Sequence, residues 1–250
     1  MTNLYTTIDE QVTQIQNAQS LDDVKMACES YCSAQELEFF LFGLCVATSL
    51  NSPQVSTLSN YPEGWFDRYF KDEMQKHDPV VKYCFENTAP IRWDSLVKNP
   101  QYTDAYGVSV MNSAAEVGLS HGLSVPIKSP TGAIAIFSMA TSSSDHFEER
   151  ANRALQTAYQ FATAILDAVT RIRLALSEQD DPQETLTKRE LDCLFWACEG
   201  KTAWEISKIL GVTERTVIFH LSSATRKLGA NNRQHAVAKA IMTGLIKPVI

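Results

Sequence analysis

The sequence predicts an α+β protein with two parts: an N-terminal α-β-α sandwich with an antiparallel sheet, and a C-terminal all-α domain of four helices. Three observations lead to this prediction. Helical and strand patterns alternate up to residue 176, whereas helical periodicity with strong capping signals dominates from residue 187. Between them, residues 177–186 are polar, contain a proline and have no apolar period, which is typical of a linker. We therefore expect domains at residues 1–176 and 187–250.

Three apolar stretches predict the sheet. Residues 36–47 (ELEFFLFGLCVA) are expected to form a buried strand, and residues 53–60 its half-exposed neighbour. Residues 123–141 are expected to form a hairpin whose turn spans residues 129–132. The central strands are apolar on both sides, so both faces of the sheet should be covered.

Helical segments are available to cover both faces. Residues 21–34, 100–118 and 148–176 have helical patterns, and Gly118 is a natural stop for the second of them. A further candidate helix, NYPEGWFDRYF at residues 60–70, contains five aromatic residues. Helical spacing places Tyr61, Trp65 and Tyr69 on one side of it, with their polar tips, whereas Phe66 and Phe70 are expected in an ordinary core.

Charge is unevenly distributed along the chain. The whole sequence has a formal net charge of −7, but residues 184–250 hold ten Lys and Arg against six Asp and Glu, giving +4. Residues 1–183 therefore hold 12 basic against 23 acidic side chains, giving −11. An acidic body with a basic tail suggests that the tail binds a polyanion.

The sequence gives no sign of export or membrane insertion. No apolar run approaches the ~18 residues that a membrane span requires. The beginning, MTNLYTTIDEQ, lacks the basic and then apolar layout of a signal peptide. None of the six cysteines shows zinc-site spacing, so we expect them to be structural and to bind no metal. We expect a cytoplasmic protein that does not bind a membrane.

Capping signals divide the C-terminal region into four short helices. Thr187 with Glu190, and Thr202 with Glu205, each fit a capping box, in which the two residues satisfy each other's backbone N–H groups. Thr213 and Asn232 can cap the third and fourth helices, and apolar residues of the fourth are expected to face inward. The inward set is Ala236, Val237, Ala240 and Ile241. Glycines that stop the helices are Gly200, Gly211, Gly229 and Gly244.

The second and third of these helices, joined at Gly211, fit a helix-turn-helix, whose second helix enters the major groove of DNA. Helical spacing gives that helix an inward stripe of Val217, Leu221, Ala224 and Leu228. The opposite stripe carries the candidate DNA contacts. They are Arg215, Ile218, Phe219, Ser222 and Arg226, with Thr216 as a second polar reader and Thr202 and Lys227 as phosphate contacts. A generic four-helix bundle is the alternative interpretation.

The C-terminal segment resembles the LuxR-type helix-turn-helix along its whole length. The residues that carry this resemblance are Glu190, Leu194, Gly200, Lys201, Thr202, Glu205, Ile206, Thr216, Val217, His220, Lys227, Leu228 and Ala236. Ile218 and Ser222 stand where some relatives use arginine to read bases, which leaves the operator sequence open. The resemblance implies a double-stranded DNA site with two-fold symmetry, a homodimer and a contact with RNA polymerase.

The N-terminal part resembles the autoinducer-binding domain of quorum-sensing regulators. NYPEGWFDRYF, HDPVV (77–81), PIRW (90–93), GLSVPI (122–127) and GAIAIFS (132–138) follow that family's order and spacing. A phosphoreceiver domain is excluded, because no strand ends in a carboxylate pair and the pattern is not βαβ. The resemblance implies that the domain binds an N-acyl-homoserine lactone and that the protein uses no other cofactor and is not an enzyme.

The resemblance also implies a set of ligand contacts. Trp65 would donate to the lactone carbonyl, Asp78 would accept the ligand amide N–H, and Tyr61 and Ser138 would donate to the acyl carbonyl. Aromatic and apolar walls would come from Tyr69, Val80 and Trp93. A small neutral ligand rich in acceptors needs such donors on apolar bodies and one strong acceptor.

Other interpretations of these residues remain open. Asp78 before Pro79 is a good helix N-cap and can serve both roles. A lone Trp65 on a helix is commonly a core residue. His121, three residues before Ser124, invites a hydrolase interpretation, but a nucleophile elbow and a third triad member are missing from the sequence. A regulator of the same fold that senses another small molecule is a further alternative.

The long helix at residues 148–176 is the expected dimer element, because its apolar residues follow a 3-4 spacing. These residues are Leu155, Ala158, Tyr159, Ala162, Ile165, Leu166 and Val169.

Overall fold

The computed structural model describes residues 4–47, 53–180 and 185–247 and confirms the predicted α+β fold class. The chain forms two compact units, of which one contains the sheet with its helices and the other contains the four C-terminal helices. The five-stranded sheet has the order β2-β1-β5-β4-β3, with antiparallel pairing of β1 with β5, β5 with β4, and β4 with β3. The strands are β1 (Phe39–Val46), β2 (Gln54–Ser59), β3 (Ile91–Arg92), β4 (His121–Lys128) and β5 (Ile134–Thr141).

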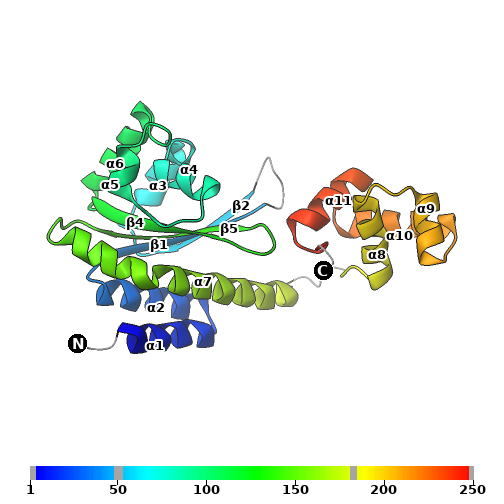
Figure 1. Ribbon diagram of the computed structural model, residues 1–250, viewed down its shortest axis with the longest axis horizontal. Helices are drawn as coiled ribbons and strands as arrows, with labels where there is room; N and C mark the ends of the chain where they lie inside the picture. The colour runs from blue at the N-terminus through cyan, green and yellow to red at the C-terminus, as the bar shows by residue number, and fades with distance from the viewer. Residues whose placement is uncertain (1–3, 48–52, 181–184, 248–250) are drawn as a thin grey trace. The chain divides into compact units, whose positions relative to one another are not determined.

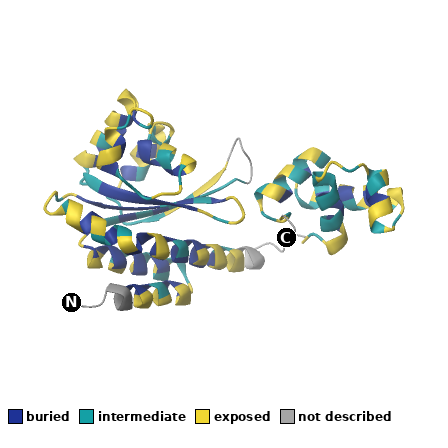
Figure 2. Ribbon diagram, viewed as in Figure 1, coloured by how far each residue is buried: buried dark blue, intermediate teal, exposed yellow. Residues whose placement is uncertain are grey.

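Helices cover both faces of this sheet, as its apolar strands require (Figure 1). On one face lie α1 (Leu4–Asn17), α2 (Leu21–Ala34) and α7 (Phe147–Asp180). On the other face lie α3 (Trp65–Lys71), α4 (Pro79–Glu86), α5 (Trp93–Val97) and α6 (Ala105–Glu116), with a short 3-10 helix, η1 (Met74–Lys76), after α3. Buried residues concentrate on the central strands and on the helix sides that face them (Figure 2).

The face covered by α2 and α7 holds a closely packed aromatic core. The Tyr31 and Phe161 rings stack with centroids 3.9 Å apart, and Phe137 of β5 lies against both. The buried Tyr31 hydroxyl lies 2.8 Å from the Thr157 hydroxyl, so its polar tip is satisfied. Because strand residues alternate between faces, the neighbours of Phe137 point to the opposite side, toward α3 to α6.

Three helix boundaries differ from the sequence prediction. The helix expected at residues 60–70 begins at Trp65, with Gly64 as its N-cap in the left-handed region, so Tyr61 precedes the helix and helical spacing does not place it. The helix expected at residues 100–118 begins at Ala105, because the Asp104 side chain accepts the Gly107 N–H and so caps it there. The helix expected to end at residue 176 continues to Asp180, so the first four residues of the expected linker are helical. Residues 181–184 of that linker lie outside the described part of the chain.

Two residues expected in the core are exposed instead. Phe70 of α3 is 44% exposed, whereas Phe66 packs against the buried cluster under this helix. Ile241 of the last helix is 48% exposed. In both helices the buried side is narrower than the apolar side that the sequence pattern predicts.

The C-terminal unit confirms the predicted capping. Its helices are α8 (Lys188–Cys198), α9 (Ala203–Leu210), α10 (Glu214–Lys227) and α11 (Arg233–Met242). Thr187 with Glu190, and Thr202 with Glu205, form complete capping boxes. Thr213 and Asn232 cap α10 and α11. Gly211, at φ +66°, occupies the left-handed region at the α9–α10 turn, a backbone conformation that glycine adopts without strain.

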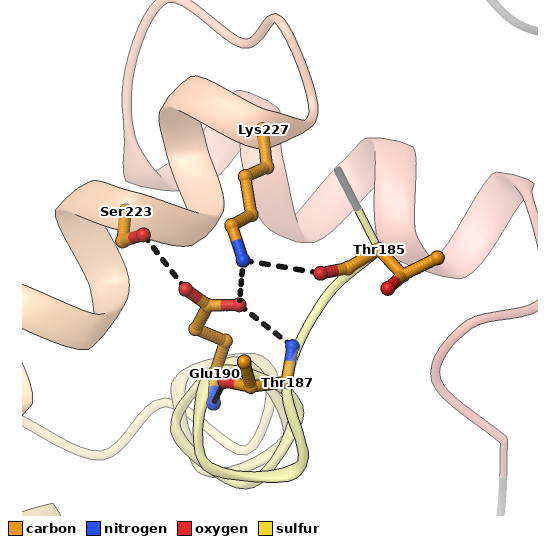
Figure 3. Close-up of polar contacts among 5 residues, drawn as sticks. All are labelled: Thr185, Thr187, Glu190, Ser223 and Lys227. Carbon is orange, nitrogen blue, oxygen red and sulfur yellow. Dashed lines mark hydrogen bonds and ion pairs between the residues drawn. The ribbon is translucent and has the colours of Figure 1, made fainter. Parts of the chain in front are cut away.

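A buried ion pair joins α8 to α10 (Figure 3). Glu190 is only 4% exposed, and its carboxylate accepts hydrogen bonds from the Ser223 hydroxyl at 2.7 Å, the Lys227 ammonium at 3.0 Å and the Thr187 backbone N–H at 2.7 Å. Lys227 also donates to the backbone carbonyl of Thr185. The pair therefore connects the start of the domain to the third helix.

In the part of the chain that the structure describes, none of the helices combines the length and apolar character needed to cross a membrane. Among the same residues, none of the His, Cys, Asp and Glu side chains form a group of three or more that could hold a metal ion.

Candidate functional site

The predicted ligand residues meet between the sheet and the layer formed by α3 to α6. Trp65, Tyr69, Val80 and Trp93 belong to one buried cluster, and Tyr61 packs against it. Helical spacing explains the pairing of Trp65 and Tyr69, whose ring centroids lie 5.7 Å apart on one side of α3. Residues separated by up to 32 positions, from Tyr61 to Trp93, are thereby gathered over one face of the sheet.

Asp78 supplies the acidic group of this cluster. One carboxylate oxygen accepts the Val80 backbone N–H at 2.7 Å and caps α4, with Pro79 at its first helical position. The other oxygen accepts the Tyr69 hydroxyl at 2.7 Å. Burial raises the pKa of Asp78 above its usual range, and the hydrogen bonds from Tyr69 and from backbone N–H groups oppose that rise only in part. The site therefore holds a carboxylate that is costly to keep charged.

Two further hydrogen-bond donors belong to this cluster or pack against it. Among the described residues, neither the Tyr61 hydroxyl nor the Trp65 indole N–H has a hydrogen-bond partner. Burial, and then the nearby Asp78, raise the pKa of Tyr61, so its hydroxyl keeps its proton. Both donors are therefore available to a molecule that offers acceptors.

Trp93 connects the cluster to the sheet. Its ring lies directly on Gly122 of β4: a Cβ atom at that position would come within 2.6 Å of the ring carbons. The Trp93 indole N–H donates to the Ser124 hydroxyl at 2.9 Å, and that hydroxyl lies 2.7 Å from the Ser138 hydroxyl. Ser138 thus belongs to the same site through Ser124, a residue without an assigned role in the sequence prediction.

The contact between Ser124 and Ser138 depends on the hairpin register, and the predicted turn implies the wrong register. The turn expected at residues 129–132 places Ser124 opposite Phe137, whereas the observed register pairs Lys128 with Ile134 and Ser124 with Ser138. A difference of one residue moves a strand partner to the other face of the sheet. The strand assignment alone therefore left the two serines unconnected.

The third helix of the C-terminal unit presents a separate candidate site. Its inward residues Val217, Leu221 and Ala224 are buried in the domain core, as predicted. The predicted outer stripe is exposed: Arg215, Ile218, Phe219, Ser222 and Arg226 all face solvent. Phe219 is 66% exposed. An outward arginine with apolar neighbours suits the edges of base pairs, including thymine methyl groups.

The remaining predicted DNA residues are already engaged within the domain. The Thr202 hydroxyl exchanges hydrogen bonds with Glu205, and the Thr216 hydroxyl lies 2.8 Å from that of Thr213. The Lys227 side chain is only 12% exposed and pairs with Glu190. Lys227 therefore holds the domain together in this structure, whereas Arg215 reaches outward.

The predicted dimer stripe of α7 is mostly inside its own unit. Ala158, Ala162 and Ile165 are fully buried, and Leu166 and Val169 are at most 5% exposed. Side chains buried against their own sheet are not available for the centre of a contact with a second chain, so most of this stripe packs within its own unit and the role of α7 in a dimer stays a prediction. Of the stripe, Tyr159 is 47% exposed and Leu155 is partly exposed.

Comparison with known proteins gives a consistent result for both units. Residues 20–168 match the family described as autoinducer binding domain, and residues 184–240 match the luxR family of bacterial regulatory proteins. The chain is 37% identical over 216 residues to the transcriptional activator protein AhyR of Aeromonas hydrophila, covering 84% of this chain and 81% of AhyR. It is 33% identical over 236 residues to the transcriptional activator protein LuxR of Aliivibrio fischeri, covering 94% and 92%.

The fold also matches a solved structure over its whole length. SdiA in complex with octanoyl-rac-glycerol superposes with a TM-score of 0.83 over 100% of this chain and 99% of SdiA, at 23% sequence identity. At this identity the likeness concerns the fold.

Proposed function

The chain belongs to the luxR family of bacterial regulatory proteins and carries an autoinducer-binding domain, and from this premise we propose that it is a cytoplasmic transcription factor whose DNA binding responds to an N-acyl-homoserine lactone. The observation that carries the proposal is the set formed by Tyr61, Trp65, Asp78 and Ser138. It combines two donors that have no described partner, on Tyr61 and Trp65, with the Asp78 carboxylate and with a Ser138 hydroxyl joined to Trp93 through Ser124.

The chemistry of the lactone fits this cluster. An N-acyl-homoserine lactone has two carbonyl groups that accept hydrogen bonds and one amide N–H that donates. The Trp65 N–H and the Tyr61 hydroxyl match the acceptors, and Asp78 matches the donor. We assign Trp65 to the lactone carbonyl, Asp78 to the amide N–H, and Tyr61 with Ser138 to the acyl carbonyl. Tyr69, Val80 and Trp93 form the surrounding wall.

Ligand binding and folding are coupled in this proposal. The carboxylate of Asp78 is buried against its electrostatic preference, as the direction of its pKa shift indicates. A charge-assisted hydrogen bond from the ligand amide is worth about 1.5–3 kcal/mol net, which relieves part of this cost. A ligand that binds only the folded state also stabilises that state by mass action.

A hydrolase on this fold would need a nucleophile, a base and a group that orients the base. His121 lies on the same strand as Ser124, but the Ser124 hydroxyl is bonded to Trp93 and Ser138. The His121 ring contacts Phe147. We therefore propose that the protein binds the lactone without cleaving it, so that a lactone incubated with the purified protein is recovered with its ring closed.

For the DNA site we propose that α10 enters the major groove and that Arg215 reads a base edge. Thr216, Ile218, Phe219 and Ser222 would lie beside it. Thr202, Arg226 and Lys227 would contact phosphates, and Lys227 would have to leave its ion pair with Glu190 to do so. We further propose a homodimer on a two-fold symmetric site, with Tyr159 and Leu176 of α7 as accessible apolar residues. The matched relatives are activators, and activation by this chain would require a contact with RNA polymerase.

Replacing Arg215 by alanine is expected to weaken binding to a specific DNA site by roughly 10- to 100-fold, because a bidentate base contact contributes about 1–3 kcal/mol of discrimination. Fluorescence anisotropy at fixed salt, with and without lactone, would measure this on a duplex selected in vitro and on a scrambled duplex. Arg189→Ala is the matched control, since Arg189 of α8 is exposed and pairs with Asp192. An equal loss on both duplexes would mean that Arg215 contacts only phosphate.

A further inference from the structure

A chain of three buried polar groups runs from α5 across the sheet. Its members are the indole N–H of Trp93, the hydroxyl of Ser124 and the hydroxyl of Ser138, joined at 2.9 Å and 2.7 Å. The two serines are 0% and 2% exposed, and Trp93 is 6% exposed. The sequence and the family comparisons assign no role to Ser124.

The positions of these groups are fixed by the fold. Ser124 and Ser138 are direct partners in the β4–β5 register, and Ile91 of β3 pairs with Ser124 from the other side. Trp93 follows β3 immediately and is seated on Gly122. Arg92, which precedes Trp93, forms ion pairs with Asp94 at 2.8 Å and with Glu148 of α7 at 3.1 Å. The strand pairing of β3, the packing of the ring on Gly122 and the ion pairs of Arg92 therefore hold the Trp93 indole N–H toward Ser124.

The donor and acceptor capacity of the three groups gives this series of hydrogen bonds a direction. An indole N–H can only donate, so the Ser124 oxygen accepts at its Trp93 side. The other described polar neighbour of the Ser124 hydroxyl is Ser138, so the Ser124 proton is satisfied only if it points to the Ser138 oxygen. Ser138 then accepts from Ser124 and must direct its own proton elsewhere. The opposite order would leave a buried hydroxyl proton of Ser124 without an acceptor, which costs free energy.

We propose that Ser124 is a positioning residue that, with Trp93, fixes the Ser138 hydroxyl as a hydrogen-bond donor and so selects ligands that present an acceptor at that point. The inference rests on the proposed function, in which Ser138 faces the acyl carbonyl of a lactone. Each hydroxyl in such a chain is polarised by the one before it, which strengthens the final donor. A ligand with a hydroxyl in place of the carbonyl would lose this match unless it turned its oxygen toward Ser138.

Two measurements on the full-length chain test this proposal, and the first needs no ligand. In the ¹⁵N-tryptophan spectrum, the Trp93 indole N–H is identified by its loss in Trp93→Phe. Ser124→Ala should shift that resonance upfield and increase its solvent exchange, because its acceptor is removed. Ser113→Ala, which removes another buried serine hydroxyl, one that accepts from Arg68, should leave the resonance unchanged. An unchanged resonance in Ser124→Ala would overturn the inference whatever the ligand proves to be.

The second measurement is a double-mutant cycle on lactone affinity, using the straight-chain N-acyl-homoserine lactone that the unmodified protein binds best. Ser138→Ala should lower affinity roughly tenfold and Ser124→Ala about three- to tenfold, the range of a single neutral hydrogen bond. In the Ser138→Ala background, Ser124→Ala should have no further effect, because its action passes through Ser138.

Restored affinity in Ser124→Thr, which keeps the hydroxyl, would support the same role. Additive losses at the two serines would overturn the inference while leaving the lactone site in place. If the unmodified protein bound none of the lactones, the proposed function would fail, and with it the assignment of Ser138 to an acyl carbonyl; the indole resonance would still report whether Ser124 orients Trp93.

Discussion

Replacing Asp78 by asparagine is expected to lower lactone affinity at least about 100-fold without disrupting the fold. Asparagine is as good an N-cap as aspartate, so the bond to the Val80 N–H can persist. The second carboxylate oxygen, however, becomes an NH₂ group that opposes the ligand amide donor. Losing a charge-assisted bond and leaving two donors face to face costs about 3 kcal/mol or more, which is about two orders of magnitude in affinity.

The pKa of Asp78 makes this variant informative about stability as well. Because burial raises the folded-state pKa above its unfolded value, the folded protein binds more protons near that pKa, and stability falls as pH rises through the shifted range. Removing the charge therefore relieves a cost at neutral pH. Without ligand, we expect the free energy of unfolding of Asp78→Asn to lie within about 1 kcal/mol of that of the unmodified protein. Removing the buried charge stabilises the folded state, and the altered contact with Tyr69 destabilises it.

Isothermal titration calorimetry with the lactone, and urea unfolding without it, would separate the two effects. Asp67→Asn is the matched control, because Asp67 lies on α3 beside the site but is exposed. A variant that lost affinity only because it unfolded would show both effects together. Normal lactone affinity in Asp78→Asn would mean that Asp78 caps α4 and has no contact with the ligand.

Replacing Glu190 by glutamine is expected to destabilise the C-terminal domain by about 3 kcal/mol, because it leaves the buried Lys227 ammonium without its counter-charge. Burial opposes the ionisation of Glu190, but hydrogen bonds from Ser223, Thr187 and Lys227 outweigh it and lower its pKa to about 2. Glutamine keeps the shape and the capping position. The loss of stability in Glu190→Gln is therefore attributable to the missing carboxylate charge.

The pH dependence of this effect has a definite sign. A carboxylate with a folded pKa of about 2 and an unfolded value near 4.3 contributes stability that is complete above about pH 5 and is lost as pH falls toward 2. The free-energy difference between the unmodified protein and Glu190→Gln should therefore shrink to roughly half at pH 3. Other titrating groups are common to both proteins and cancel.

Hydrogen exchange measured on peptides from α8 and α10 would locate the effect in this domain. Glu199→Gln is the control, since Glu199 is exposed at the end of α8. Equal protection in Glu190→Gln and Glu199→Gln at neutral pH would show that the ion pair contributes little. In that case Lys227 would be available to contact phosphate, as the sequence suggested.

The sequence predicted best those features that depend on neighbouring residues. The capping boxes at Thr187 and Thr202, and the N-cap at Asp78, follow from side chains and backbone groups within three positions of each other. The capping bonds themselves join residues that are near neighbours in the sequence, so a local pattern is enough to predict them. The central strands β1, β4 and β5 were also predicted, because both faces of the sheet are covered and these strands are therefore largely apolar. The two-residue strand β3 (Ile91–Arg92) was missed, since two residues are too few to show a period.

Features that depend on tertiary contacts were harder to predict. The apolar spacing of α7 indicated a stripe but gave no sign of whether it meets its own sheet or a second chain, and Ile165 proved to be buried within its own unit. Ser124 depended on a register that the turn residues left uncertain by one position. The buried pairing of Lys227 with Glu190 joins residues 37 positions apart, so helical periodicity could not reveal it.

The most direct test of the proposed function is to identify the small molecule that the full-length protein retains. The protein would be produced in a host that makes several N-acyl-homoserine lactones, purified, and its bound molecules extracted and identified by mass spectrometry. We predict one lactone per chain with its ring closed, retained by the unmodified protein and by Asp67→Asn but not by Asp78→Asn. A ring-opened product, a molecule of another class, or equal retention by Asp78→Asn would contradict the proposal.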